Sequence, residues 1–143
     1  MNQRIGIFAG SFDPVHKGHV AFALQALKEA KLDNVYFLPE IQPRNKEGIT
    51  HVGHRIAMLK LALAPHPNFY LLELPGRQFS VTKTLPRLEQ KFAGHELFLL
   101  MGSDVYKNLS NWPNYERLLK VGLIACLAQV RYKNSNSGAR SFF

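Results

Sequence analysis

The chain has almost no cysteine and no long apolar run. Its 143 residues include one cysteine, Cys126, which excludes an internal disulfide and suits a reducing cytosol. No apolar stretch reaches the roughly 18 residues that span a membrane, and the first residues show no signal-peptide pattern. We therefore expect one cytoplasmic domain, residues 1–143, with a sizeable core and no membrane contact.

Acidic side chains are scarce relative to basic ones. Eighteen Lys and Arg residues against ten Asp and Glu give a formal net charge of +8, which favours anionic partners such as phosphorylated metabolites, nucleic acid or acidic proteins. The basic residues are spread along the chain, and no helix-turn-helix, zinc or RNA-binding signature accompanies them. Nucleic-acid binding therefore ranks last among the candidate functions.

Apolar runs alternate with helical patterns along the chain. The expected strands are Arg4–Ala9, Asn34–Leu38, Phe69–Leu72, Glu96–Met101 and Leu123–Val130, and the expected helices are His19–Ala30, His54–Ala64, Thr82–Phe92 and Pro113–Val121. This alternation is typical of βαβ crossovers. We expect an α/β, Rossmann-like fold, with an open parallel sheet of about five strands and helices on both faces. Its ligands would bind beyond the carboxyl ends of the strands.

A phosphate-binding pattern follows the first expected strand, in the segment Gly10-Ser-Phe-Asp-Pro-Val-His16-Lys-Gly18-His19. A strand, a small-residue turn and a helix start expose backbone N–H groups and the positive end of the helix dipole. His16 and His19 can face one ligand, and Gly18 lets a phosphate approach the backbone. The alternative is that both histidines only cap the helix. The flanking strand and amphipathic helix favour a site for a nucleotide triphosphate.

The HxGH motif of this segment resembles the signature of the nucleotidyltransferase superfamily, and later motifs resemble those of the bacterial nicotinate-nucleotide adenylyltransferases. In chain order the later motifs are Leu38-Pro39 with Pro43-Arg44-Asn45-Lys46, Arg55-Ile-Ala-Met58-Leu59, Arg77 to Leu85, Gly102-Ser103-Asp104 with Leu109 and Trp112, and Arg131-Tyr132. The resemblance implies Mg²⁺-dependent adenylyl transfer from ATP to nicotinate mononucleotide, which yields the dinucleotide and pyrophosphate in NAD biosynthesis.

The resemblance also divides the site residues into groups. It implies His16 and His19 as the catalytic pair at the triphosphate. On the ATP side it implies Gly10, Ser11, Phe12, Gly18, Ser135, Ser137 and Arg140, and on the mononucleotide side Lys46, Thr82, Thr84, Gly102, Asp104, Trp112 and Arg131. Helix capping stays open as an alternative for the two threonines and the aspartate, and simple packing for the tryptophan. No metal ligand of the chain itself is expected, because His51 and His54 lack an acidic or cysteine partner at ligand spacing.

The end of the chain departs from the family pattern. The family carries a second phosphate motif, Ile-Ser-Ser-Thr-x-x-Arg, at a helix start well after its last strand. Here Asn134-Ser135-Asn136-Ser137-Gly138-Ala139-Arg140 follows the last expected strand almost directly, and the sequence stops at Phe143. A compact paralogue, a truncated chain and a gene product without its C-terminal part are the three interpretations. The terminal phenylalanine pair leaves a homo-oligomer open.

The identity of the acceptor is also open. Val81 stands where the family has tyrosine, and Arg44-Asn45 stand where it has proline and histidine. Nicotinamide mononucleotide and phosphopantetheine are alternative acceptors within the superfamily. A nucleotide-binding paralogue with weak or lost turnover is the alternative from a different functional class.

Overall fold

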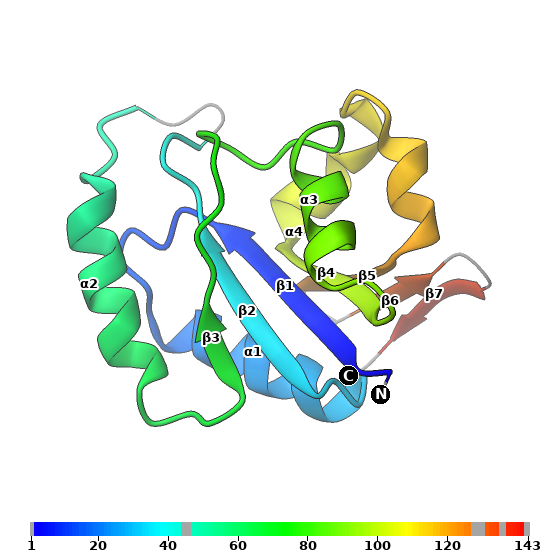
Figure 1. Ribbon diagram of the computed structural model, residues 1–143, viewed down its shortest axis with the longest axis horizontal. Helices are drawn as coiled ribbons and strands as arrows, with labels where there is room; N and C mark the ends of the chain where they lie inside the picture. The colour runs from blue at the N-terminus through cyan, green and yellow to red at the C-terminus, as the bar shows by residue number, and fades with distance from the viewer. Residues whose placement is uncertain (1, 44–46, 127–130, 135–136, 142–143) are drawn as a thin grey trace.

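The computed structural model describes residues 2–43, 47–126, 131–134 and 137–141. In this part of the chain a seven-stranded sheet has the order β3-β2-β1-β4-β5-β6-β7 (Figure 1). The strands are β1 Arg4–Gly10, β2 Asn34–Pro39, β3 Phe69–Leu71, β4 Glu96–Gly102, β5 Gly122–Cys126, β6 Arg131–Asn134 and β7 Ser137–Ser141. Strands β1 to β5 pair in parallel, whereas β6 and β7 pair antiparallel.

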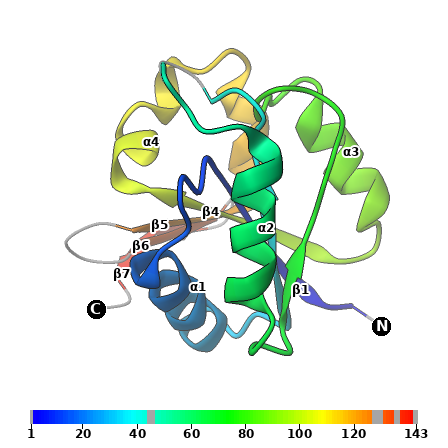
Figure 2. The ribbon, with the colours of Figure 1, turned by 90° about the vertical axis from the view of Figure 1, so that its left-hand side faces the viewer.

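Helices cover both faces of the sheet. They are α1 Lys17–Glu29, α2 Val52–Leu63, α3 Thr84–Lys91 and α4 Ser103–Lys107, followed by 3₁₀ helices at Leu109–Asn111 and Tyr115–Lys120. Helices α1 and α2 lie on one side of the sheet and α3 and α4 on the other (Figure 2). Along β1, Ile7 belongs to the core under α3 and Phe8 to the core under α1 and α2, as the two-residue period of a strand requires. The expected α/β architecture is confirmed.

Three local expectations differ from the structure. The sheet has two strands more than the expected five, because β6 and β7 form an antiparallel hairpin at its edge. The last expected strand, Leu123–Val130, is described as β5 up to Cys126, and residues 127–130 lie outside the described residues. The expected helix Pro113–Val121 is a 3₁₀ helix that starts at Tyr115, because Asn114 adopts a left-handed conformation with φ 61° and interrupts the helical run.

The strand order reverses direction between β1 and β4. Strands β2 and β3 lie on one side of β1, and β4 and β5 lie on the other. The connections that leave β1 and β4 therefore diverge at the carboxyl edge, which is where ligands bind in open α/β sheets. Phe8 pairs with Leu100 in the register of these strands, so the turn after β1 and the start of α4 lie at the same edge. Within the described residues, no helix is both long and apolar enough to cross a membrane.

Candidate functional site

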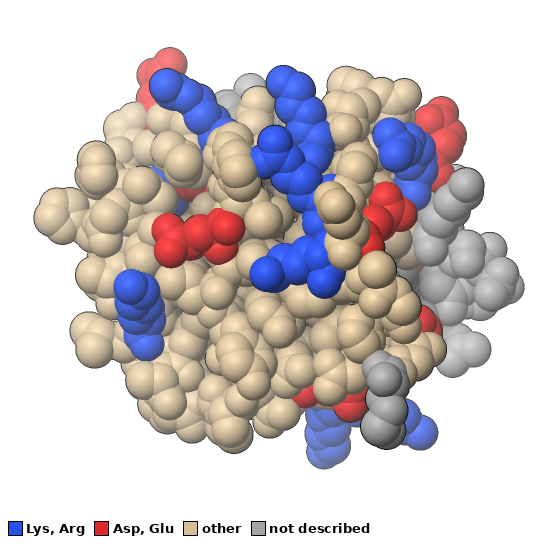
Figure 3. Space-filling model, viewed as in Figure 1, with Lys and Arg blue, Asp and Glu red and all other residues tan. Residues whose placement is uncertain are grey.

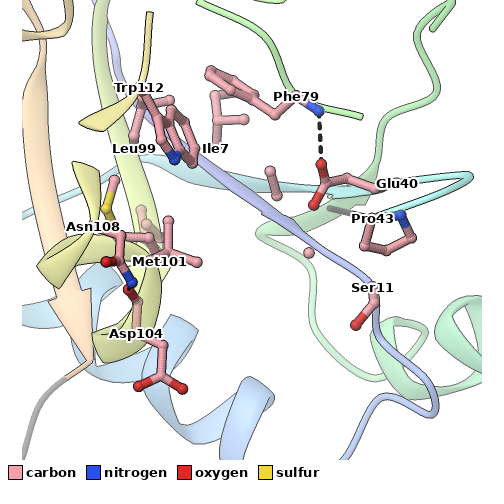
Figure 4. A pocket seen from close by; sticks show the side chains of 14 residues that line it. Ile7, Ser11, Glu40, Pro43, Phe79, Leu99, Met101, Asp104, Asn108 and Trp112 are labelled. Atoms are coloured by element: carbon pink, nitrogen blue, oxygen red, sulfur yellow. Dashed lines mark hydrogen bonds between the residues drawn. The ribbon is translucent and has the colours of Figure 1, made fainter. Parts of the chain in front are cut away.

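A cavity of about 360 Å³ lies at the carboxyl edge of β1 and β4 (Figure 4). Four of the residues expected from the sequence line it, namely Gly10, Ser11, Asp104 and Trp112. Its polar wall also contains two residues that sequence reasoning missed, Glu40 and Asn108. Glu40 directly follows β2, and a polar residue at the carboxyl end of a parallel strand is a usable signal for a site.

The histidine pair is built into the first turn of α1. His16 is the N-cap residue, and its Nδ1 accepts the Gly18 N–H at 3.0 Å. The His16 N–H in turn donates to Nδ1 of His19, also at 3.0 Å, and the two rings stack with centroids 3.7 Å apart. Because both Nδ1 atoms accept hydrogen bonds, the proton of each neutral ring lies on Nε2. The pair therefore caps the helix and also carries two imidazole N–H donors.

The structure shows a steric reason for a glycine at position 18, and the expected approach of a phosphate there stays a prediction. A Cβ at this position would lie 2.9 Å from Cε1 of His16, so the glycine makes room for the capping ring itself. Phe12 differs from Gly10 and Ser11 because its side chain belongs to the core and does not line the cavity. Its side chain is buried, with its ring edge-on to His19 at a centroid distance of 5.1 Å, and its backbone is left-handed with φ 48°. Only the backbone of Phe12 is left to face a ligand.

An aromatic wall closes the other end of the cavity. Phe79 and Trp112 both line it, with ring centroids 5.9 Å apart and planes inclined by 37°. Trp112 thus lines the cavity, and its contact with a mononucleotide stays a prediction. Asp104 lies exposed in the first turn of α4. Gly102 is the N-cap of that helix, so the aspartate is not its cap and its carboxylate stands at the cavity rim.

The two threonines lie outside the cavity lining. Thr84 is buried and its Oγ1 accepts the Ser80 N–H at 2.8 Å. The Ser80 hydroxyl lies 3.1 Å from Oγ1 of Thr82. Both hydroxyls therefore stabilise the turn that leads into α3. These hydrogen bonds agree with the capping alternative, whereas contact with a mononucleotide stays a prediction.

The C-terminal segment does not begin a helix. Ser137 and Arg140 lie on β7, and Arg131 lies on β6, whereas Lys46 and Ser135 lie outside the described residues. Only two residues join β6 to β7, and so short a connection reverses the chain into an antiparallel pair. Ser137 and Arg140 are then separated by about 10 Å along an extended strand, which is too far for the contiguous cradle that a helix start provides.

Basic side chains cluster on one face of the described chain, close to the cavity wall. Lys and Arg side chains gather over α3 and the loop that leads into it (Figure 3), and this loop carries Phe79 of the cavity wall. Among the described residues, no group of three or more His, Cys, Asp or Glu side chains could hold a metal ion. Nδ1 of His51 accepts the Gly53 N–H at 3.0 Å, so this histidine caps α2.

Comparison with known proteins matches the chain to one family. The family model for cytidylyltransferase-like proteins matches residues 7–141. The nicotinate-nucleotide adenylyltransferase of Bacillus subtilis is 36% identical over 125 residues, which are 83% of this chain and 66% of that protein. Proteins named as probable enzymes of the same kind are 39% identical in Thermomicrobium roseum (85% of this chain, 59% of the relative) and 35% in Thermus thermophilus (90% and 71%).

A solved structure shows the same fold. The nicotinic acid mononucleotide adenylyltransferase of Plasmodium falciparum superposes with a TM-score of 0.75 at 18% identity, over 87% of this chain and 64% of that chain. The chain spans about 60% of the length of the first two relatives that it matches. Family model and relatives agree, and the resemblance is confirmed. The chain belongs to the cytidylyltransferase-like family and, within it, to the nicotinate-nucleotide adenylyltransferases.

Proposed function

We propose that this chain transfers the adenylyl group of ATP to nicotinate mononucleotide, with release of pyrophosphate. The observation that carries the proposal is the stacked pair of His16 and His19 at the start of α1, which carries two imidazole N–H donors and follows Gly10 and Ser11 of the cavity lining along the chain. The names of the relatives support the same reaction, and the Plasmodium protein was solved in complex with NaAD.

The chemistry needs positioning and charge stabilisation more than a side-chain nucleophile. A phosphate oxygen of the mononucleotide attacks the α-phosphorus of ATP, and the bond from that phosphorus to the β-phosphate oxygen breaks. Pyrophosphate leaves with the bonding electrons. The attacking oxygen is already anionic at neutral pH, so no general base is required. Donors aimed at the developing charge are worth roughly 10²- to 10³-fold each, and Nε2 of His16 and of His19 are suited to this role.

In this proposal the cavity holds the triphosphate of ATP on one side and the mononucleotide on the other. On the triphosphate side, the backbone from Gly10 to Phe12 and the positive end of the α1 dipole would hold phosphate oxygens. On the acceptor side, the ring of Trp112 offers an apolar face for the pyridine ring, and Asp104 offers an acceptor at the rim. The proposal includes further contacts on both sides. Those with ATP come from Ser135, Ser137 and Arg140, and those with the mononucleotide come from Lys46, Thr82, Thr84, Gly102 and Arg131.

In this proposal Mg²⁺ enters with the nucleotide. Magnesium is commonly held by substrate phosphates and waters with few protein ligands. Bound with ATP, the ion would supply positive charge that stabilises the negative charge developing on the phosphates. We place the reaction in the cytoplasm, where one unpaired cysteine is compatible with a reducing environment.

The decisive experiment offers the purified chain several acceptors. ATP and Mg²⁺ are supplied with nicotinate mononucleotide, nicotinamide mononucleotide or phosphopantetheine, and pyrophosphate and the joined product are quantified. We expect the highest kcat/KM with nicotinate mononucleotide. A higher value with another acceptor would reassign the substrate, and no pyrophosphate with any of them would refute the enzymatic function.

One observation favours a second candidate, which is nucleotide binding without efficient turnover. Ser137 and Arg140 lie on an edge strand instead of at a helix start, so the second phosphate contact of the family is differently built. Calorimetry with ATP and with the dinucleotide decides between the two candidates. Binding together with background turnover supports the second candidate, and absence of binding removes both.

A further inference from the structure

Arg55 is fully buried in the first turn of α2 although it carries a permanent charge. It is 0% exposed and is the largest of the fully buried side chains of the described residues. A guanidinium stays protonated in proteins, and a buried charge is costly unless hydrogen bonds compensate for its lost hydration. Its surroundings must therefore supply several strong acceptors.

All three guanidinium nitrogens donate to main-chain carbonyl oxygens. Nε donates to Thr50 at 2.7 Å, Nη1 donates to Ser11 at 2.7 Å and to Glu40 at 2.8 Å, and Nη2 donates to Ile41 at 2.8 Å. The acceptors come from the turn after β1, the loop after β2 and the residue before the N-cap of α2. One rigid, planar fork thus holds three separate segments together.

Two of these acceptors belong to residues that line the cavity, whereas Arg55 itself does not line it. Ser11 lies on the triphosphate side. Glu40 lies on the facing wall, and its Oε2 accepts the Phe79 N–H at 2.7 Å (Figure 4). Phe79 in turn packs against Trp112. A continuous series of contacts therefore runs from behind the cavity to its aromatic wall.

We propose that Arg55 is a positioning residue that sets the spacing between the triphosphate side and the acceptor side of the cavity. What the two sides hold rests on the adenylyl transfer proposed above. A misplacement of about 1 Å can lower the rate of such a reaction about 100-fold without removing any group that binds either substrate. Lysine is a poor substitute, because its ammonium is a point donor on a flexible stem.

Trp112 provides a readout that needs no activity, because it is the single tryptophan of the chain. We expect Arg55→Lys to shift the emission of Trp112 and to increase its quenching by acrylamide, although Arg55 does not line the cavity. The matched control is Lys60→Gln, at an exposed position of the same helix, which should leave both quantities unchanged. A folded Arg55→Lys protein with the wild-type emission and quenching overturns the proposal.

Kinetics separate positioning from binding. With ATP and nicotinate mononucleotide, Arg55→Lys should lower kcat about 100-fold and keep both KM values within about threefold, and Lys60→Gln should behave as the wild type. A raised KM with an unchanged kcat overturns the positioning role. Absence of turnover in the wild type refutes only the proposed reaction, since the Trp112 measurement still tests Arg55.

A second pair of variants covers the case in which Arg55→Lys does not fold. Glu40→Asp withdraws the carboxylate from the Phe79 N–H, whereas Glu40→Gln keeps an acceptor oxygen of the same reach. We expect the aspartate variant to shift the emission of Trp112 and the glutamine variant to retain it. If both variants have the same emission, the Glu40–Phe79 hydrogen bond does not influence the position of Trp112, and the proposal fails.

Discussion

The ring of His19 stacks on that of His16 at a centroid distance of 3.7 Å, and each ring uses Nδ1 to accept a backbone N–H of the same turn. Helix capping and ligand binding were alternatives for these residues in the sequence. In the structure they involve different nitrogens of one ring, because Nδ1 caps the helix and Nε2 keeps its proton as a donor. The two effects can therefore be separated by substitution.

Replacement of His16 by asparagine should preserve the helix and remove the donor. Asparagine is among the best N-cap residues, so His16→Asn should unfold at the same urea concentration as the wild type. Its turnover should fall about 10²- to 10³-fold, the usual cost of one lost donor to a transition state. His16→Ala should lose a similar amount of activity and also about 1 kcal/mol of stability. Pyrophosphate release and urea unfolding provide both readouts, and an active His16→Asn variant would exclude Nε2 from catalysis.

Gly18→Ala should act by displacing the capping ring of His16. Its Cβ would lie 2.9 Å from Cε1 of His16, so the ring must move and turnover should fall. Gly53→Ala is the matched control, because its Cβ would lie 3.1 Å from Nδ1 of His51, a ring with no assigned role. Crystal structures and turnover of both variants check this. Equal losses of activity in the two variants would indicate a general helix effect.

The sequence predicts those parts of the site that a local motif specifies. The turn after β1 and the histidine pair are contiguous in sequence, so their strand–turn–helix context is visible without a structure. Trp112 is placed in the pocket only by the order of the family motifs. The partners of Arg55 cannot be predicted from the sequence. Its acceptors are main-chain carbonyls up to 44 positions away, and every residue carries a carbonyl, so residue type does not identify them.

The C-terminal edge shows a different limit. Ser137 and Arg140 match the spacing of a phosphate motif, but spacing does not determine whether the segment starts a helix or a strand. The two-residue connection to β6 imposes the antiparallel pair. Similarly, the helical pattern over Pro113–Val121 does not show that Asn114 is left-handed. Neither outcome follows from residue spacing or helical periodicity alone, because both depend on local backbone geometry.

Removal of the side chain of Trp112 should weaken binding of the acceptor and leave binding of ATP unchanged. Stacking on an aromatic ring is worth about 1–3 kcal/mol, so Trp112→Ala should raise the KM for nicotinate mononucleotide roughly 5- to 150-fold. Trp112→Phe should raise it less, since a smaller ring remains beside Phe79. Separate titrations of the two substrates measure the effect. An equal rise in the KM for ATP would show that the aromatic wall supports the whole site instead.

Alkaline pH should destabilise the chain partly through Tyr36. Burial, together with the neighbouring Tyr70, raises the pKa of Tyr36 above its ordinary value of 10.0. The unfolded chain then loses this proton at a lower pH than the folded chain, so the free energy of unfolding declines as the pH rises above about 10. Tyr36→Phe should show a shallower decline. Urea unfolding of both proteins between about pH 8 and pH 11 tests this, and parallel curves would contradict the linkage.

Chelation of divalent cations should stop turnover and leave the fold intact. If Mg²⁺ enters with ATP, the ion has no structural role in the nucleotide-free protein. EDTA should therefore abolish pyrophosphate release while the unfolding temperature of the nucleotide-free protein stays unchanged. Structural metal sites behave differently, because their metal-binding energy is part of the folding energy. A fall in the unfolding temperature with EDTA, reversed by added metal, would reveal a resident ion. Turnover that scales with the Mg²⁺–ATP concentration would instead identify the complex as the substrate.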